Sequence, residues 1–203
     1  MSHKIYALIG PSGSGKTTIA NELFTKQQQQ IVSFTSRDPR PGEIEGVDYY
    51  FIGRKTPDEI HQLEQDWRDG ILIEVIEYNN HVYGYTTKEV AQKFNPETTS
   101  VVTVVTKEGY DHLMLSSFKN DIVPVYVSVT RDTVKKHLLD RDDTPENIEK
   151  RLALYDAEIK QRDWFDTLDE PKILLHNDSD TIATVVEQFK QAMSKIEKED
   201  KTV

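Results

Sequence analysis

The stretch Lys4-Ile-Tyr-Ala-Leu-Ile-Gly10-Pro-Ser-Gly-Ser-Gly-Lys16-Thr17 decides the fold class of this chain. Its first six residues form a short apolar run that ends at Gly10, which is typical of a buried strand. Residues 10–17 match the pattern G-x-x-x-x-G-K-[ST], and helix-forming residues follow. A strand, a glycine-rich loop and a helix in this order predict a loop whose backbone N–H groups and helix N-terminus hold phosphate groups.

The loop indicates a nucleoside triphosphate site, with ATP as the expected donor and Mg²⁺ as its cofactor. Lys16 supplies a cation for the β- and γ-phosphates, and Thr17 supplies a hydroxyl ligand for the metal. A glycine-rich turn that only begins a helix is the alternative interpretation, and the full motif disfavours it. The expected ATP-binding residues are Gly10, Pro11, Ser12, Gly13, Ser14, Gly15, Lys16, Thr17 and Thr18.

Beyond the loop, apolar runs alternate with helical segments. Strands are predicted at residues 31–34, 48–52, 71–77, 101–105, 123–130 and 172–175, and helices near 57–66, on both sides of a breaker at 140–145, and over 182–196. Residues 27–30, a run of glutamines, are interpreted as a solvated connection. The β-branched runs at 101–105 and 123–130 are typical of strands buried on both faces. The pattern predicts an α/β fold with a parallel sheet and helices on both of its faces.

Composition narrows the class of protein. The chain has 203 residues and a formal net charge of −10, which predicts one compact domain and disfavours binding to long nucleic acids. It contains no cysteine, which excludes disulfides, thiolate metal sites and cysteine nucleophiles. We expect a cytoplasmic protein without a membrane partner, because no apolar run is long enough to span a bilayer and residues 1–20 lack a signal-peptide layout.

A second basic segment stands out against this acidic background. Arg37 and Arg40 are three residues apart in Arg37-Asp-Pro-Arg40-Pro-Gly, and Tyr49 follows. Two guanidinium groups with a nearby phenol can hold a phosphate through several charge-assisted hydrogen bonds. The base-reading motif N-K-x-D of GTPases does not occur in the sequence. A small P-loop chain with a second anion site is therefore predicted to be a phosphotransferase.

The longer segment from Ser33 to Tyr49 resembles guanylate kinases, whose pattern reads S-x-T-T-R-x-x-R-x-G-E-x-x-G-x-D-Y. The resemblance continues through Ile73-Glu74 and Val82-Tyr83-Gly84. It implies that the acceptor phosphate is held by Arg37, Arg40, Tyr49 and Tyr83. It also implies that Ser33 and Glu74 face the guanine base, whose N1–H and N2–H₂ groups a carboxylate accepts. Arg141 and Arg151 match the lid arginines of the family and are, with Lys16, the expected catalytic residues.

The resemblance implies a P-loop NTPase-type core (residues 1–32, 90–130 and 162–203), an inserted acceptor subdomain (33–89) and a helical lid (131–161). The implied reaction is transfer of the γ-phosphoryl group of ATP to GMP or dGMP, by a monomer or homodimer. One alternative is a related P-loop kinase with another nucleotide or a sugar phosphate as acceptor. Two others are a guanylate-kinase-like protein-binding module, disfavoured by the intact loop, and a nucleic-acid-dependent ATPase, disfavoured by the acidic charge.

Some positions depart from the family pattern. Guanylate kinases carry L-D-I-D-x-Q-G after the acceptor segment, whereas Thr103–Gly109 of this chain has Val104 and Thr106 in place of both aspartates. Tyr85 stands where the family has Ser or Thr, and His137 stands where it usually has Arg. Thr106 remains an expected base contact through a neutral hydrogen bond. We therefore expect intact phosphoryl chemistry and a weaker or differently built preference for guanine.

Overall fold

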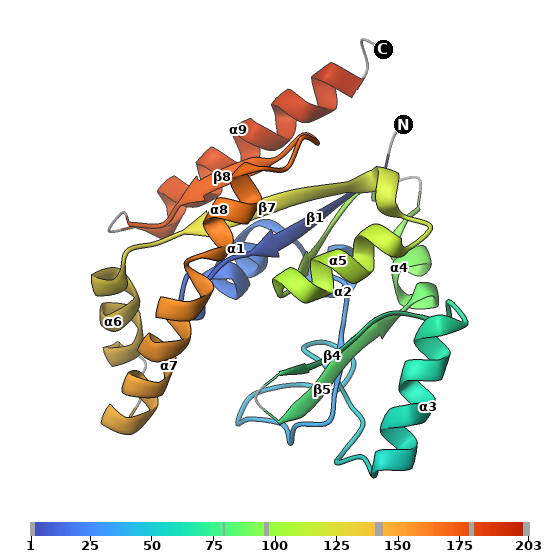
Figure 1. Cartoon of the computed structure of the whole chain (residues 1–203). Coiled ribbons are helices and arrows are strands. Elements are labelled where there is room, and N and C mark those ends of the chain that lie inside the picture. The colour runs from blue at the N-terminus through green and yellow to red at the C-terminus, as the bar shows by residue number, and fades with distance from the viewer. Residues whose placement is uncertain (1–2, 79, 96–97, 141–143, 179–180, 201–203) are drawn as a thin grey trace. The chain divides into compact units, whose positions relative to one another are not determined.

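The computed structural model describes residues 3–78, 80–95, 98–140, 144–178 and 181–200 (Figure 1). The elements in chain order are β1 Lys4–Ile9, α1 Lys16–Leu23, α2 Lys26–Gln29, β2 Phe34–Thr35, β3 Tyr50–Phe51, α3 Pro57–Arg68, β4 Leu72–Tyr78, β5 His81–Thr86, α4 Thr87–Lys93, β6 Ser100–Val104, α5 Lys107–Leu115, the 3₁₀ turn η1 Lys119–Asp121, β7 Ile122–Ser128, α6 Arg131–Leu139, α7 Pro145–Glu158, α8 Gln161–Asp166, β8 Ile173–His176 and α9 Ile182–Asp200. The predicted strand, loop and helix at the N-terminus are confirmed.

Among the described residues, the strands form two four-stranded sheets, ordered β6-β1-β7-β8 and β3-β2-β5-β4. Residues Ile5–Ile9 of β1 are completely buried, and β7 is buried from Ile122 to Val127. Strands β7 and β8 pair in parallel, with Val125 opposite Ile173. The β-branched run of β7 is therefore a buried parallel strand, and the α/β class with a parallel sheet is confirmed.

The chain divides into two compact units. The small-sheet unit comprises residues 1–6 and 24–122, and the phosphate-loop unit comprises residues 7–23 and 123–203. Strand β1 supplies residues to both units. The small-sheet unit carries the arginine and tyrosine candidates for the acceptor, whereas the phosphate-loop unit carries Lys16 and Arg151.

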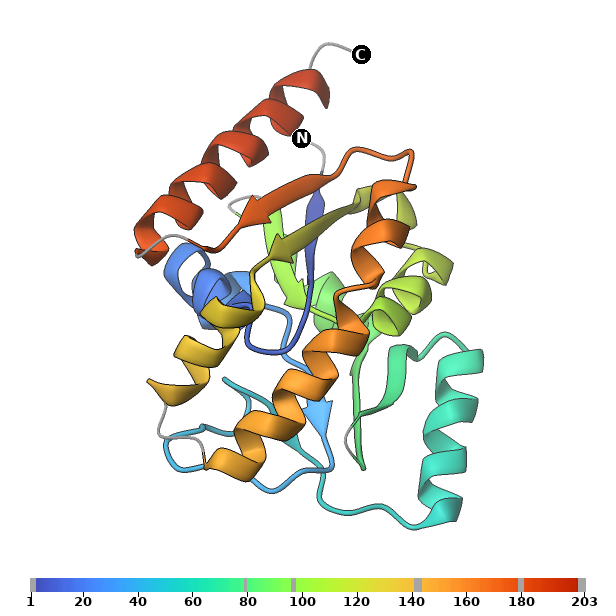
Figure 2. The same ribbon diagram turned by 60° about the vertical axis from the view of Figure 1, so that its left-hand side comes forward.

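In the phosphate-loop unit, α9 packs beside β8 through an apolar stripe in which Val185 and Phe189 are completely buried (Figures 1 and 2). Helices α6 and α7 pack together through a second cluster that contains Val134, Leu138 and Leu152. Thr130 and Thr144 cap the N-termini of these two helices with their side chains.

In the small-sheet unit, α3 lies along the β4–β5 hairpin (Figure 2). Its N-terminus is fixed by a capping box between Thr56 and Glu59, with Pro57 in the first turn. Its apolar side, Ile60, Leu63 and Trp67, packs on a cluster formed by Phe34, Leu72 and Val82. One face of the small sheet is thereby covered by α3.

The short elements differ most from the sequence-based expectations. The predicted strand 31–34 begins only at Phe34, and β5 was not expected as a strand. Strand β5 contains Gly84, whose missing side chain is required because a Cβ there would collide with the Glu74 carbonyl oxygen. A glycine at a close backbone approach weakens the local strand signal. Residues 27–29 of the glutamine run belong to the short helix α2.

In the described part of the chain, no helix has the length and apolar character needed to cross a membrane.

Candidate active site

The phosphate loop between β1 and α1 adopts a glycine-dependent conformation. Gly13 and Gly15 have φ angles of 81° and 90°, where side chains are strained. A Cβ on Gly13 would lie 2.8 Å from Val134 Cγ1, and one on Gly15 would lie 2.5 Å from Asn177 Nδ2. The side chain of Asn177, which follows β8, also donates to the Ser14 carbonyl at 2.8 Å. The loop is therefore held in place by α6 and by the end of β8.

Lys16 points back into its own loop. Its ammonium group donates to the carbonyl oxygens of Gly10 at 2.7 Å and Pro11 at 2.9 Å. Burial lowers the pKa of Lys16 to about 8, and the attraction of Glu158 opposes that shift. Holding a cation in this position without a phosphate partner is electrostatically unfavourable. A bound phosphate anion would offset the cost of desolvating the Lys16 ammonium.

A carboxylate occupies part of the loop. Glu158, at the C-terminal end of α7, accepts a hydrogen bond from the backbone N–H of Ser12 at 2.6 Å. A backbone N–H of a P-loop is a group expected to bind a phosphate oxygen. Glu158 therefore stands where a negatively charged ligand oxygen would be accepted.

The residues of the loop fit a magnesium ion that arrives with a nucleotide. Thr17 lies exposed in the first turn of α1, and its hydroxyl has no partner among the described residues. The described residues contain no group of three or more His, Cys, Asp and Glu side chains able to hold a metal. Mg²⁺ is commonly held by few protein ligands together with substrate phosphates, which matches this arrangement.

In the small-sheet unit, Arg37 is held rigidly. Its guanidinium donates two hydrogen bonds of 2.9 Å to the Glu43 carboxylate and one of 2.7 Å to the Asp38 carbonyl. It also lies 5.3 Å from the ring centre of Tyr49, within cation–π range. Tyr49 in turn meets Tyr83 edge to face, with ring centres 6.2 Å apart. The structure thus brings together three of the four predicted phosphate ligands.

Arg40, the fourth predicted phosphate ligand, is exposed and is tied to Glu43 through its backbone: its N–H donates to the Glu43 carboxylate at 2.7 Å, and its carbonyl accepts from the Glu43 N–H at 3.0 Å. Burial would raise the pKa of Glu43, but the bonds from Arg37 and Arg40 outweigh it and lower that pKa. Glu43 remains ionised and orients Arg37. The Glu43 carboxylate, bound to the Arg37 guanidinium, occupies a position in which an acceptor phosphate could bind.

A cluster of buried polar atoms lies in the small-sheet unit, on β4, β5 and β6. Glu74 of β4 is directly opposite Tyr85 of β5, and both are almost completely buried. Among the described residues, Glu74 Oε1, the Tyr85 hydroxyl and the Thr103 hydroxyl have no hydrogen-bond partner. Burial, with a contribution from Glu108, raises the pKa of Glu74 to about 8. Unpartnered buried polar groups are costly, so this cluster is suited to the polar edge of a ligand.

Two other predicted positions, Thr106 and Ser33, have structural roles. Thr106 caps α5, where its hydroxyl accepts from the Gly109 N–H at 3.0 Å. Gly109 lets α5 approach the carboxyl of Glu74, because a Cβ there would collide with Oε1. The Ser33 carbonyl accepts from the Tyr50 N–H at 2.9 Å, which holds β3, and Val104 is partly exposed.

One of the two predicted lid residues lies on α7. Arg151 is half-buried on that helix, and Arg141 lies outside the described residues. His137 on α6 contacts the phosphate loop, its Nδ1 lying 3.1 Å from the Gly13 carbonyl oxygen. Because a carbonyl can only accept, His137 donates from Nδ1 in this contact.

Sequence reasoning missed three residues that contact these sites: Glu43, Glu158 and Asn177. Asn177 had a usable signal, because polar side chains directly after a buried parallel strand often reach the ligand edge of the sheet. Glu43 lies inside the longer segment from Ser33 to Tyr49, three residues after Arg40. Glu158 had no local signal, since it lies 146 residues from the N–H group that it contacts.

A phosphate-binding loop at the end of a buried strand of an α/β sheet defines the chain as a P-loop protein. Its family is more specific. The family model for guanylate kinase matches residues 2–196, and the chain therefore belongs to the guanylate kinase family.

Individual relatives agree with this assignment. The guanylate kinase of Homo sapiens is 31% identical over 197 residues, covering 92% of this chain and 90% of the human protein. The guanylate kinase of Sus scrofa is 32% identical over 160 residues, covering 75% of each chain. The crystal structure of guanylate kinase from Anaplasma phagocytophilum matches with a TM-score of 0.66 and 21% identity, covering 96% of this chain and 86% of that one. This structural match supports the fold.

Proposed function

We propose that this chain transfers the γ-phosphoryl group of ATP to GMP or dGMP. An oxygen of the acceptor phosphate attacks the γ-phosphorus, the bond to the β,γ-bridging oxygen breaks, and ADP and GDP or dGDP are released. The observation that carries the proposal is the intact phosphate loop, with the Lys16 ammonium directed into it, in a chain that matches the guanylate kinase family over nearly its whole length.

On the donor side, the proposal assigns ATP to the loop residues 10–18. Their N–H groups hold the phosphates, and Lys16 exchanges its carbonyl partners for phosphate oxygens. Thr17 would hold Mg²⁺ through its hydroxyl together with the phosphates, and the ion would supply charge neutralisation at the transferred group. Water is excluded by the closing protein, which prevents loss of ATP to hydrolysis.

On the acceptor side, the phosphate of GMP is assigned to Arg37, Arg40, Tyr49 and Tyr83. The contacts of Arg37 support this, because Tyr49 lies beside its guanidinium and the Glu43 carboxylate already makes with it the bidentate ion pair that a phosphate would make in its place. The base is assigned to Ser33, Glu74 and Thr106. The N–H groups of guanine would give the buried Glu74 carboxyl the partners that it lacks, and would favour its ionised form.

The lid is assigned to Arg141 and Arg151, whose charges would stabilise the transferred phosphoryl group. The same proposal divides the chain into a core, an acceptor subdomain at 33–89 and a lid at 131–161. It also keeps the expectations of a monomer or homodimer, a cytoplasmic location, and no nucleic-acid or membrane partner.

The test is a panel of acceptors incubated with MgATP and analysed by product mass. The panel contains GMP, dGMP, AMP, CMP, UMP and ribose 1,5-bisphosphate, with ATP alone as the blank. We expect GDP and dGDP, together with less discrimination against other bases than an enzyme with both aspartates would show. Phosphorylation of the sugar phosphate alone would favour the related P-loop kinase instead. The absence of any product would favour a binding module.

The base preference has its own test within the same panel. Stringent selectivity for GMP that is unaffected by Thr106→Ala would contradict the proposed alteration of the base site. It would leave the phosphoryl-transfer assignment intact, because Thr106 is separate from the phosphate-holding residues.

A further inference from the structure

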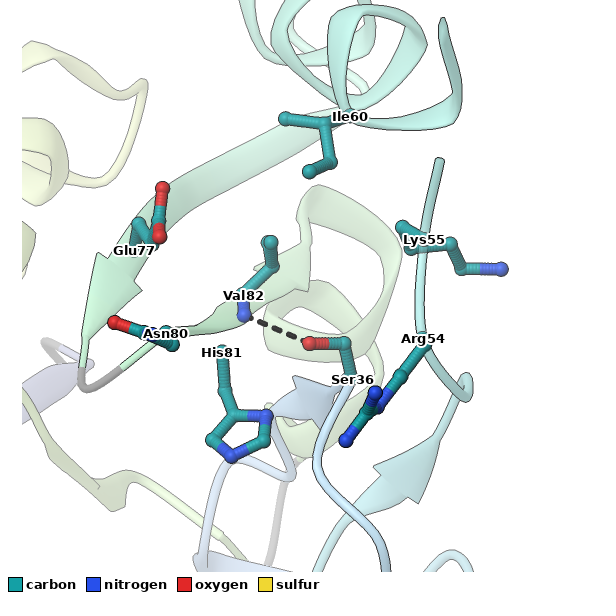
Figure 3. Close-up of a pocket in the computed structure, with 8 residues that line it drawn as sticks. All are labelled: Ser36, Arg54, Lys55, Ile60, Glu77, Asn80, His81 and Val82. Atoms are coloured by element: carbon teal, nitrogen blue, oxygen red, sulfur yellow. Dashed lines mark hydrogen bonds between the residues drawn. The ribbon is translucent and has the colours of Figure 1, made fainter. Parts of the chain in front are cut away.

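A cavity of about 400 Å³ opens in the small-sheet unit (Figure 3). Its apolar floor is formed by Val82 of β5 and Ile60 of α3. The polar residues around it are Ser36, Arg54, Lys55, Glu77, Asn80 and His81. The volume falls within the range of about 300–1,000 Å³ that is typical of small-molecule sites. No role in the proposed transfer reaction uses this cavity.

The cavity lies on the opposite face of the small sheet from the acceptor residues. In the β4–β5 hairpin, Glu77 pairs with Val82, whereas Glu74 pairs with Tyr85. Side chains alternate along a strand, so Glu77 and Val82 face one side, and Glu74, Tyr83 and Tyr85 face the other. The side of Val82 is the side covered by α3. A ligand in this cavity is thus separated from the Arg37–Tyr49 cluster by the sheet itself.

The right-hand wall in Figure 3 is suited to an anion. The exposed Arg54 turns its guanidinium toward Ser36 and has no hydrogen bond or ion pair among the described residues. The Ser36 oxygen accepts from the Val82 N–H at 2.9 Å, which leaves its hydroxyl hydrogen to donate to a ligand. Lys55 points away from the cavity, and its ammonium lies 3.4 Å from Glu59.

The opposite wall accepts hydrogen bonds. Glu77 and Asn80 lie together there, across the cavity from Arg54 (Figure 3). The Glu77 carboxylate has no ion pair within the described part of the chain. A carboxylate repels a second anion but accepts strongly from hydroxyl groups. One wall of the cavity is therefore suited to a negatively charged group of a ligand, and the opposite wall to its hydrogen-bond donors.

We propose that this cavity binds a small phosphate monoester that carries several hydroxyl groups, of the size of a pentose phosphate. The phosphate is held by Arg54 and the Ser36 hydroxyl, since a guanidinium binds phosphate oxygens in a bidentate manner. The hydroxyl groups donate to Glu77 and Asn80, and the carbon skeleton rests on Val82 and Ile60. The site is independent of the proposed kinase reaction and of its substrates.

The test is a titration of the full-length, ¹⁵N-labelled protein, followed through backbone amide resonances. The probes are ribose 5-phosphate, inorganic phosphate and ribose. We expect ribose 5-phosphate to shift the amides of Ser36, Arg54 and Val82 along one saturable curve. Inorganic phosphate should bind about tenfold more weakly, and ribose alone should not bind, because charge-assisted hydrogen bonds dominate the affinity.

Variants locate the binding. Arg54→Gln should weaken binding of ribose 5-phosphate about tenfold, whereas Arg68→Gln, an arginine of α3 outside the cavity, should leave it unchanged. Glu77→Gln should reduce the affinity for ribose 5-phosphate and leave that for inorganic phosphate unreduced. Equal effects of Arg54→Gln and Arg68→Gln would overturn the proposal. So would the absence of saturable shifts, or shifts confined to residues 37–49 and abolished by Arg40→Gln, which would place the probe in the acceptor site.

Discussion

The buried carboxyl of Glu74 couples the stability of the fold to pH. Its pKa is raised from an ordinary 4.5 to about 8, so the folded chain keeps a proton that the unfolded chain releases between these values. Raising the pH through this window therefore favours unfolding, by at most about 1.4 kcal/mol per pH unit from this one group. The free energy of unfolding should fall more steeply from pH 5 to 8 in the wild type than in Glu74→Gln.

Urea denaturation at several pH values measures this difference. Glu77→Gln, an exposed carboxylate on the same strand, is the matched control and should keep the wild-type slope. Parallel profiles for the wild type and Glu74→Gln would show that Glu74 is ionised in the folded protein.

The hydroxyl of Tyr85 provides a second prediction at this scale. It is buried without a partner among the described residues, so Tyr85→Phe should raise the free energy of unfolding by about 1 kcal/mol. If guanine supplies the missing partner, the same change should raise the KM for GMP by several-fold, up to about tenfold. Steady-state kinetics and urea denaturation measure the two effects separately.

Tyr126→Phe is the control for Tyr85→Phe. The Tyr126 hydroxyl is also buried without a described partner, but it belongs to the phosphate-loop unit and lies outside the predicted base contacts. It should give the stability gain without the change in KM. A stability gain in Tyr85→Phe with an unchanged KM for GMP would remove the Tyr85 hydroxyl from base recognition.

At the scale of elements, helix α7 is tied to the phosphate loop by the bond from Ser12 to Glu158. The proposed ATP phosphates compete for this N–H group, and they are repelled by the carboxylate that holds it. Glu158→Gln should therefore lower the KM for ATP by several-fold, up to about tenfold, with little change in the KM for GMP.

Kinetics at varied ATP concentration would test this role of α7. Glu149→Gln removes an exposed carboxylate from the same helix and should leave both constants unchanged. A raised KM for ATP in Glu158→Gln would show instead that Glu158 supports nucleotide binding. The small-sheet unit has the same arrangement of a carboxylate in a proposed phosphate position, since Glu43 binds Arg37 where the acceptor phosphate is proposed to bind.

For the whole molecule, the predictable parts are those fixed by neighbouring residues. The structures of β1, the phosphate loop and β7 can each be predicted from the residues of that segment alone: an apolar run, a loop motif and a β-branched run. Strand β5 does not, because Gly84 belongs to a strand only through its close contact with β4. The quoted motifs identified Arg37, Tyr49 and Tyr83, which cluster in the structure. The contact of Glu158 with the loop spans most of the chain, and no local pattern predicts it.

The division into two units leads to the last prediction. Lys16 and Arg37 belong to different units, and each is held by contacts within its own unit. Lys16→Ala should reduce phosphoryl transfer by about 10³-fold while leaving the affinity for GMP unchanged. Arg37→Gln should weaken GMP binding about tenfold or more while leaving the affinity for ATP unchanged.

Calorimetric titration of each variant with each nucleotide measures these affinities, and circular dichroism checks the fold. An active Lys16→Ala protein would refute the phosphate-loop assignment, whereas loss of both affinities in either variant would show that the two sites depend on each other.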